Sequence, residues 1–205
     1  MNFEPEGWAQ IWDTWQKGGT LMIPLLLLSV YAYYVGFELF FHLRQMLPRN
    51  RKGLRSSPAT MIREPEAVDG VLGEILVECM ATGNDREETR RRFRQVRSES
   101  GKTLNRRIRF LVALIASAPL LGLLGTVDGM LATFRGLTVE VGRKMDLVAG
   151  GISEALITTQ TGLMIAIPAY VLLHLVLRRK TEWLHLLRLL ESHATRKMAA
   201  SKPSS

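Results

Sequence analysis

Apolar residues gather in three long blocks of this chain, and the charged residues lie between the blocks. A helix that crosses a bilayer needs about 20 consecutive apolar residues, and residues 20–41, 108–134 and 147–177 each provide such a length. Apolar blocks that alternate with charged segments are typical of membrane proteins. We therefore expect an all-α membrane protein with three long transmembrane helices and helical cytoplasmic extensions.

The third block, residues 147–177, is unusual because it contains a carboxylate. Glu154 is its one acidic residue. The polar side chains around it are Ser153, Thr158, Thr159, Gln160 and Thr161. A charged group at the centre of a membrane helix costs on the order of 3 kcal/mol, so such a group usually faces protein or water. Because hydroxyl groups both donate and accept hydrogen bonds, the cluster suits the binding or transfer of protons or ions.

The second block, residues 108–134, has small and hydroxylated residues on one helical face. These residues are Gly122, Gly125, Thr126, Gly129 and Thr133. Small side chains let helix backbones approach each other closely. We therefore expect this face to meet another helix or to line a pore.

Two further features of the spans bear on the site. Pro119 lies inside the second span and Pro168 in the second half of the third, and an interior proline kinks a membrane helix or frees a carbonyl group. Asp128 lies about 200° round the helix from Thr126, away from the small-residue face. A structural role near the outer interface and a part in ion transfer both stay open for Asp128.

The segments outside the spans are polar. Residues 1–19 place Trp8, Trp12 and Trp15 on one helical face, which predicts an amphipathic helix at the outer interface. Gly18-Gly19 breaks that helix, and Thr20 can cap the first span. Residues 42–107 predict a helical cytoplasmic loop with an irregular first part, residues 135–146 a short periplasmic loop, and residues 178–205 a basic cytoplasmic tail.

Charge gives the expected orientation. The chain carries a formal net charge of +8, and its basic residues are concentrated in 42–107 and 178–205. The positive-inside rule places these segments in the cytoplasm and the N-terminus outside, although the short loop, with Arg135, Arg143 and Lys144, is mildly contrary. The single cysteine, Cys79, excludes an intrachain disulfide and a cysteine metal cluster.

Enzyme and nucleic-acid functions find little support. The sequence shows no zinc finger, recognition helix or aromatic RNA-binding strand. Its four histidines lack the spacing of zinc ligands and lie near or beyond the ends of the spans. We therefore expect neither an enzyme nor a cofactor or metal.

Three stretches, taken together, resemble the ExbB/TolQ family of proton-channel subunits, with a more distant likeness to MotA. They are GGTLMIPLLLLS at 18–29, APLLGLLGTVDGM at 118–130 and GISEALITTQTGLMIAIPA at 151–169. The resemblance implies that Glu154, Thr159 and Thr126 match the family's proton-linked residues. Asp128 occupies a position that is usually uncharged in the family, which bears on the choice of ion.

The resemblance also implies a molecular setting. It implies a pentamer in the bacterial inner membrane, with the second and third spans around a central pore. The expected partners are an ExbD- or TolR-like single-span protein with a transmembrane aspartate, and a TonB- or TolA-like protein driven by the proton motive force. Thr158 joins the predicted proton pathway, and Gly122, Gly125, Gly129, Gly162, Pro119 and Pro168 are predicted to serve helix packing or the pore.

The sequence leaves several alternatives open. The chain could be a structural membrane scaffold that conducts no ions, with Glu154 needed only for packing. It could also work on Na⁺ in place of H⁺, and an ExbB-like role is not separable from a TolQ-like role. An intramembrane enzyme is the weakest reading, because no nucleophile–base pair or metal cluster is visible.

Overall fold

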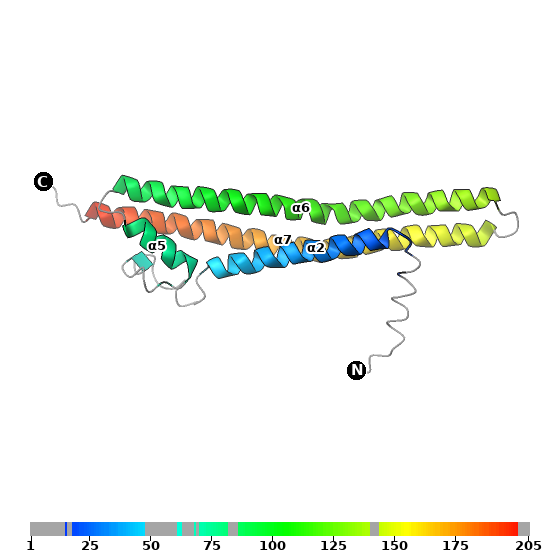
Figure 1. Ribbon diagram of the computed structural model, residues 1–205, viewed down its shortest axis with the longest axis horizontal. Helices are drawn as coiled ribbons and strands as arrows, with labels where there is room; N and C mark the ends of the chain where they lie inside the picture. Colours follow the sequence, from blue (N-terminus) through cyan, green and yellow to red (C-terminus); the bar gives the residue numbers. More distant parts are fainter. Residues whose placement is uncertain are drawn as a thin grey trace, which may run out of the picture. The chain divides into compact units, whose positions relative to one another are not determined.

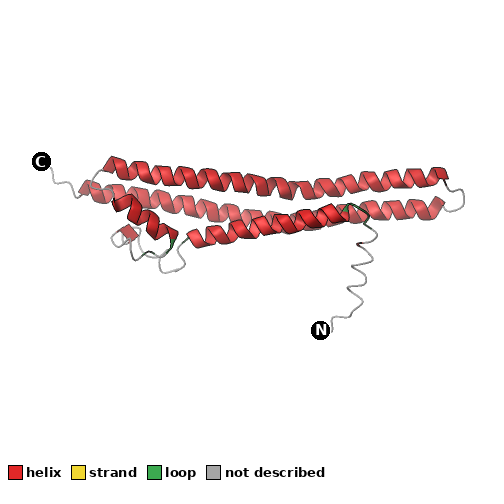
Figure 2. Cartoon of the chain, viewed as in Figure 1, coloured by secondary structure: helices red, strands yellow, loops and turns green. Residues whose placement is uncertain are grey.

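The computed structural model describes residues 15, 18–47, 61–62, 68, 70–81, 86–139 and 144–200. The helices are α2 (Met22–Met46), α5 (Val71–Ala81), α6 (Arg86–Val139) and α7 (Lys144–Ala200) (Figure 1). The described residues form helices and short turns and include no strand (Figure 2). Helices α2, α6 and α7 are each long and apolar enough to cross a membrane. These helices confirm the prediction of an all-helical chain with three possible membrane spans.

Helices α6 and α7 continue well beyond the predicted spans. Helix α6 has 54 residues and joins the charged stretch after Arg86 to the second apolar block without a break. Helix α7 has 57 residues and joins the third block to the basic tail. A change from polar to apolar residues alters what a helix faces, but it does not end the helix unless a stop signal is present. Pro119 and Pro168 lie inside these helices, where each removes one backbone donor.

The described chain divides into two compact units. The first contains Met1–Val35 and Leu111–Val171, and the second contains Gly36–Phe110 and Leu172–Ser205. In the first unit α6 and α7 lie side by side and run in opposite directions (Figure 1). Helix α2 lies beside α7 there, since the Tyr33 hydroxyl donates a hydrogen bond to the carbonyl oxygen of Ile165 at 3.0 Å.

The second unit has an apolar core with charged residues at its edge. Its largest buried side chains include Trp183, Phe93, Leu43, Leu72, Leu76, Leu187 and Leu190. Leu72, Leu76 and Cys79 form the buried face of α5, whereas Val71 is 40% exposed. Removal of the apolar side chains from water is the main force that stabilises this unit.

Ion pairs join α6 to its neighbours in the second unit. Glu191 on α7 has a side chain that is 14% exposed. It forms ion pairs with three arginines on successive turns of α6: Arg90, Arg94 and Arg97. The closest pair joins Arg97 Nη1 to Glu191 Oε2 at 2.8 Å. Arg107 pairs with Glu38 of α2 at 3.2 Å, and both side chains are about half exposed. Glu38 is therefore a paired carboxylate.

Some sequence predictions concern residues outside the described part. They include the tryptophan face at Trp8 and Trp12, the irregular stretch at 48–60, the middle of the short loop at 140–143, and the end of the tail at 201–205. These predictions stay predictions.

Candidate ion-transfer site

Glu154 lies on α7 in the first unit and is partly buried. Its carboxyl group reaches the turn that precedes α2: a Cβ atom built on Gly19 would overlap Oε1 of Glu154 and would lie 2.7 Å from its Cδ. Within the described residues, the carboxylate makes no hydrogen bond or ion pair. The carboxyl group of Glu154 thus lies against the backbone of the turn that precedes α2.

Thr159 joins α7 to α6. Its hydroxyl oxygen lies 3.0 Å from the carbonyl oxygen of Gly122 on α6 and 3.2 Å from that of Ala155 on its own helix. A hydroxyl has one proton to donate, so the two carbonyls are alternative acceptors. The side chain is only partly buried, which leaves its lone pairs open to a water.

Thr158 sits deeper than its neighbour. It is 1% exposed and packs against Gly125 of α6. Its hydroxyl donates within its own helix, to the carbonyl of Ala155 at 3.0 Å or of Glu154 at 3.1 Å. This placement favours a packing role for Thr158, although the sequence grouped it with the predicted proton pathway.

The small residues of α6 meet α7. A Cβ on Gly129 would lie 2.9 Å from the carbonyl oxygen of Gly151, and a Cβ on Gly122 would lie 3.1 Å from that of Thr158. On the α7 side, a Cβ on Gly162 would lie 2.7 Å from the carbonyl oxygen of Ala118. The face predicted to meet a helix or to line a pore therefore contacts a helix of the same chain.

The sequence predicts two further polar residues of α6 at the site, Thr126 and Asp128. Thr126 is partly buried, and its hydroxyl donates to the carbonyl of Leu123 at 2.6 Å. Asp128 is exposed, whereas Gly125 and Gly129 on either side of it are buried. Asp128 therefore points away from the α6–α7 contact.

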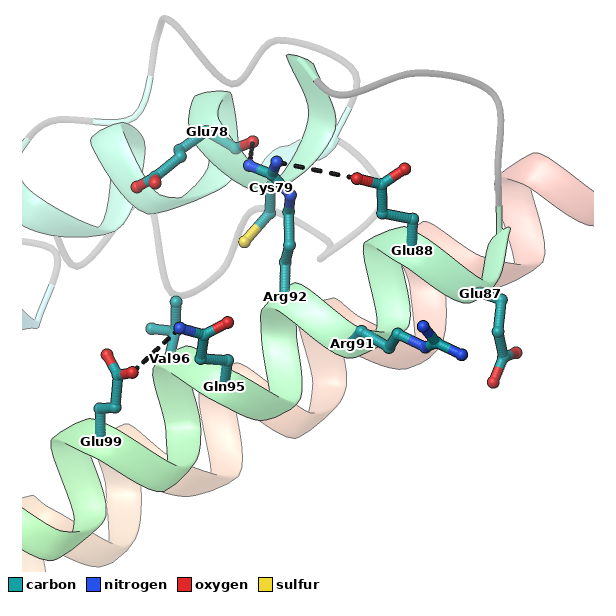
Figure 3. A pocket seen from close by; sticks show the side chains of 9 residues that line it. All are labelled: Glu78, Cys79, Glu87, Glu88, Arg91, Arg92, Gln95, Val96 and Glu99. Atoms are coloured by element: carbon teal, nitrogen blue, oxygen red, sulfur yellow. Dashed lines mark hydrogen bonds and ion pairs between the residues drawn. The ribbon is translucent and has the colours of Figure 1, made fainter.

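A second polar region lies between α5 and α6, within the second unit. A cavity of about 780 Å³ is lined there by Glu78, Cys79, Glu87, Glu88, Arg91, Arg92, Gln95, Val96 and Glu99 (Figure 3). Arg92 bridges the carbonyl of Glu78 and the carboxylate of Glu88 in it. No group of three or more potential metal ligands occurs in the described part of the chain.

Sequence reasoning missed the Gly19 turn as a neighbour of Glu154. The pair Gly18-Gly19 signals a break between helices, but nothing local in the sequence shows which residue of another helix the turn will contact. It also missed the contact of Gly151 with Thr133, whose hydroxyl donates to the carbonyl of Gly129 at 2.9 Å.

Comparison with known proteins identifies the class of this chain. Residues 64–188 match the model of the MotA/TolQ/ExbB proton channel family. The chain is 32% identical over 182 residues to the biopolymer transport protein ExbB-like 1 of Synechocystis. The aligned region covers 83% of this chain and 72% of that protein. It is 30% identical over 173 residues to the biopolymer transport protein ExbB of Pseudomonas putida. This aligned region covers 77% of this chain and 53% of that protein.

A shorter match is to a TolQ protein. Over 85 residues the chain is 39% identical to the Tol-Pal system protein TolQ of Pseudomonas aeruginosa, with 42% of this chain and 37% of that protein covered. The chain belongs to the MotA/TolQ/ExbB proton channel family. It is accordingly a multi-pass membrane protein of a family of motor and transport subunits, and the resemblance seen in the sequence is confirmed.

Proposed function

We propose that this chain is the proton-channel subunit of an inner-membrane motor of the ExbB–ExbD or TolQ–TolR type. The observation that carries the proposal is Glu154, a partly accessible carboxylate inside an apolar helix long enough to cross a membrane. It lies within the part of the chain that matches the family model. An ionisable group inside a membrane span points to an ion pathway or a proton relay.

Glu154 would take up a proton and pass it on. Thr159 supports this role because its partly buried hydroxyl can hold a water while it remains bonded to α6. Thr126 offers a second hydroxyl on α6, and an aspartate in the single span of an ExbD- or TolR-like partner would be the next station. Asp128 is the alternative proton carrier if Glu154 fails the test below.

The proposed assembly is a pentamer in which α6 and α7 surround a central pore that holds the partner's single spans. The exposed apolar residues of α6 and α7 support it, because large apolar side chains stay uncovered on both helices: Leu120, Leu123, Val127, Leu156, Met164 and Ile167. Proton flow would move the partner within the pore. That movement would energise a TonB- or TolA-like protein that reaches toward the outer membrane.

The proposed orientation places the N-terminus and the short loop after α6 outside, and the long loop and the tail in the cytoplasm. The charge distribution supports this arrangement, because the long loop and the tail are rich in Lys and Arg. With this orientation Glu154, in the first half of the third apolar block, lies toward the outer side of the membrane.

The test replaces Glu154 by Gln, a nearly isosteric change that removes the ionisable group. We expect Glu154→Gln to assemble as the wild type does and to lose proton flux when it is reconstituted in liposomes with its single-span partner, as measured with an internal pH-sensitive dye. Glu154→Asp should keep part of the flux. Glu182→Gln is the matched control, since Glu182 lies on the same helix, outside the third apolar block, and pairs with Arg178 and Arg179 at its surface.

The outcome also separates the alternatives. Full proton flux through Glu154→Gln would contradict the proposal and make Asp128 the candidate proton carrier. A scaffold without conduction predicts no flux even for the wild type. Replacing the proton gradient with a sodium gradient in the same liposomes distinguishes an H⁺-driven from a Na⁺-driven subunit.

A further inference from the structure

Gly19 adopts a backbone conformation that glycine favours. It lies in the turn before α2 with a φ of 68°, in the left-handed region that side chains with a Cβ rarely adopt. Among the described residues, Gly70 shares this property with a φ of 85°, and a Cβ at position 70 would meet only the carbonyl oxygen of Gln45 at 3.8 Å. Backbone shape alone is thus a sufficient reason for glycine at position 70.

Position 19 carries a second requirement. A Cβ there would overlap Oε1 of Glu154 and would lie 2.7 Å from its Cδ and 3.3 Å from its Cγ. The end of the acidic side chain therefore occupies the space that a side chain at position 19 would fill. The same turn also packs one helical turn further along α7, because a Cβ on Gly18 would lie 3.2 Å from Cγ2 of Ile157.

Hydrogen bonds hold this turn on both sides. The backbone N–H of Gly18 donates to the carbonyl of Trp15 at 3.0 Å, and the N–H of Met22 donates to the carbonyl of Gly19 at 3.3 Å. The turn leads directly into α2, which begins at Met22. A turn held by backbone hydrogen bonds on both sides presents a fixed surface to the Glu154 carboxyl group.

We propose that Gly19 is a positioning residue for Glu154: the turn before α2 fixes where the carboxylate stands, so the first span forms part of the ion-transfer site. The inference rests on the proposed role of Glu154 in proton transfer. Transfer between two groups depends steeply on their separation, and a misplacement of about 1 Å can lower a rate by about 10²-fold. A side chain at position 19 would force the carboxyl group to another position.

The first experiment measures proton flux in liposomes for the full chain with its single-span partner. We expect Gly19→Ala to lower the flux by roughly 10- to 100-fold. Gly70→Ala serves as the control for backbone strain, since it places the same methyl group at a similar φ where nothing is displaced. It should leave the flux near that of the wild type.

The second experiment tests whether the loss passes through Glu154. Glu154→Asp withdraws the carboxylate by one methylene group, so the double variant Gly19→Ala/Glu154→Asp should conduct better than Gly19→Ala alone. A purely structural role of the turn would not be rescued by shortening an acid on another helix. Losses that simply add in the double variant, or wild-type flux in Gly19→Ala, would overturn the inference.

A third measurement covers the case in which Gly19→Ala does not assemble. The unfolding temperatures in detergent of Gly19→Ala, Glu154→Ala and the double variant then form a cycle. If the collision with the acid is the cause, Glu154→Ala restores most of the unfolding temperature that Gly19→Ala loses. A loss that persists in the double variant refutes the inference.

Loss of flux in Glu154→Gln is a separate result, so the proposed function can stand while the role of Gly19 fails. Full flux in Glu154→Gln would contradict the proposed function itself.

Discussion

The Thr159 hydroxyl shows how one residue can serve both structure and ion transfer. It bonds across to α6, whereas the Thr161 hydroxyl, two residues further on, donates to the carbonyl of Ile157 within α7 at 2.8 Å. Both threonines are partly buried and lie on the same helix. They differ chiefly in whether the hydroxyl reaches the neighbouring helix.

We therefore predict that Thr159→Val destabilises the protein more than Thr161→Val does. Loss of one interhelical hydrogen bond costs about 1 kcal/mol, which corresponds to a fall of about 2–4 °C in the unfolding temperature for a chain of this size. Thermal unfolding of both variants in the same detergent measures the difference. Equal shifts would mean that the bond to Gly122 contributes nothing.

Proton flux in Thr159→Val should be weakened but present, because a water can replace the hydroxyl.

Cys79 gives a prediction about pH at the same scale. Burial raises the pKa of the Cys79 thiol to about 11; the Glu78 carboxylate adds to the rise and the Arg92 guanidinium opposes it. The thiolate is the reactive form, so we expect slow alkylation of the folded protein at neutral pH and a rate that rises steadily as the pH approaches 11. Mass spectrometry of the alkylated protein, with a denatured sample as reference, measures the rate of alkylation.

The raised pKa also fixes the sign of a stability effect. In the unfolded chain the thiol loses its proton at a pH near its usual pKa of about 8.5, before the folded form does. The stabilising contribution is therefore complete at neutral pH and is lost as the pH rises toward 11. Cys79→Ala should remove this part of the pH dependence, and an unchanged profile would contradict the assignment.

At the scale of elements, the close approach of α6 to α7 depends on glycine. Gly162 and Gly150 both lie on α7, but a Cβ on Gly162 would press on the carbonyl oxygen of Ala118, whereas a Cβ on Gly150 would meet nothing within 4 Å. A backbone oxygen cannot move aside as a flexible side chain can. The two glycines thus have different reasons to be present.

We predict opposite effects of the same substitution at these positions. Gly162→Ala should destabilise the protein by about 1–3 kcal/mol because the helices must separate locally. Gly150→Ala should stabilise it by about 0.5–1 kcal/mol, since alanine loses less conformational entropy in a helix than glycine does. Denaturation curves of the two variants in one detergent decide the matter, and destabilisation by both would show that the contact geometry is not the cause.

At the scale of the whole molecule, the proposed orientation can be tested with cysteines placed at exposed positions. Cys79 itself is buried and would report its burial as much as its side of the membrane. Met145, at the start of α7, is 85% exposed, and Lys102 on α6 is exposed as well. In a Cys79→Ala background, Met145→Cys and Lys102→Cys therefore report on opposite ends of the span in α6.

We expect a membrane-impermeant maleimide to label Met145→Cys in intact right-side-out vesicles and to label Lys102→Cys only after permeabilisation. The physical reason is the retention of Lys- and Arg-rich segments on the cytoplasmic side. The Cys79→Ala chain without an added cysteine gives the background. The reverse labelling pattern would invert the orientation and place Glu154 toward the cytoplasm.

The sequence by itself determined the helical class, the three apolar spans and the presence of a carboxylate in the third. These features depend on local chemistry: a run of apolar side chains specifies a span, and small residues at helical spacing specify a face that another helix can approach. The same reasoning placed Asp128 off the small-residue face, where the structure also has it.

The tertiary structure decided which partner each face meets. It placed the glycines of α6 against α7 of the same chain, buried Thr158 in that contact, and brought Glu154 to the turn at Gly19. It also joined charged and apolar stretches into the single helices α6 and α7. Contacts between residues as far apart as Gly19 and Glu154 depend on how whole helices pack, and side-chain spacing along one helix carries no information about the residue that packing will bring against it.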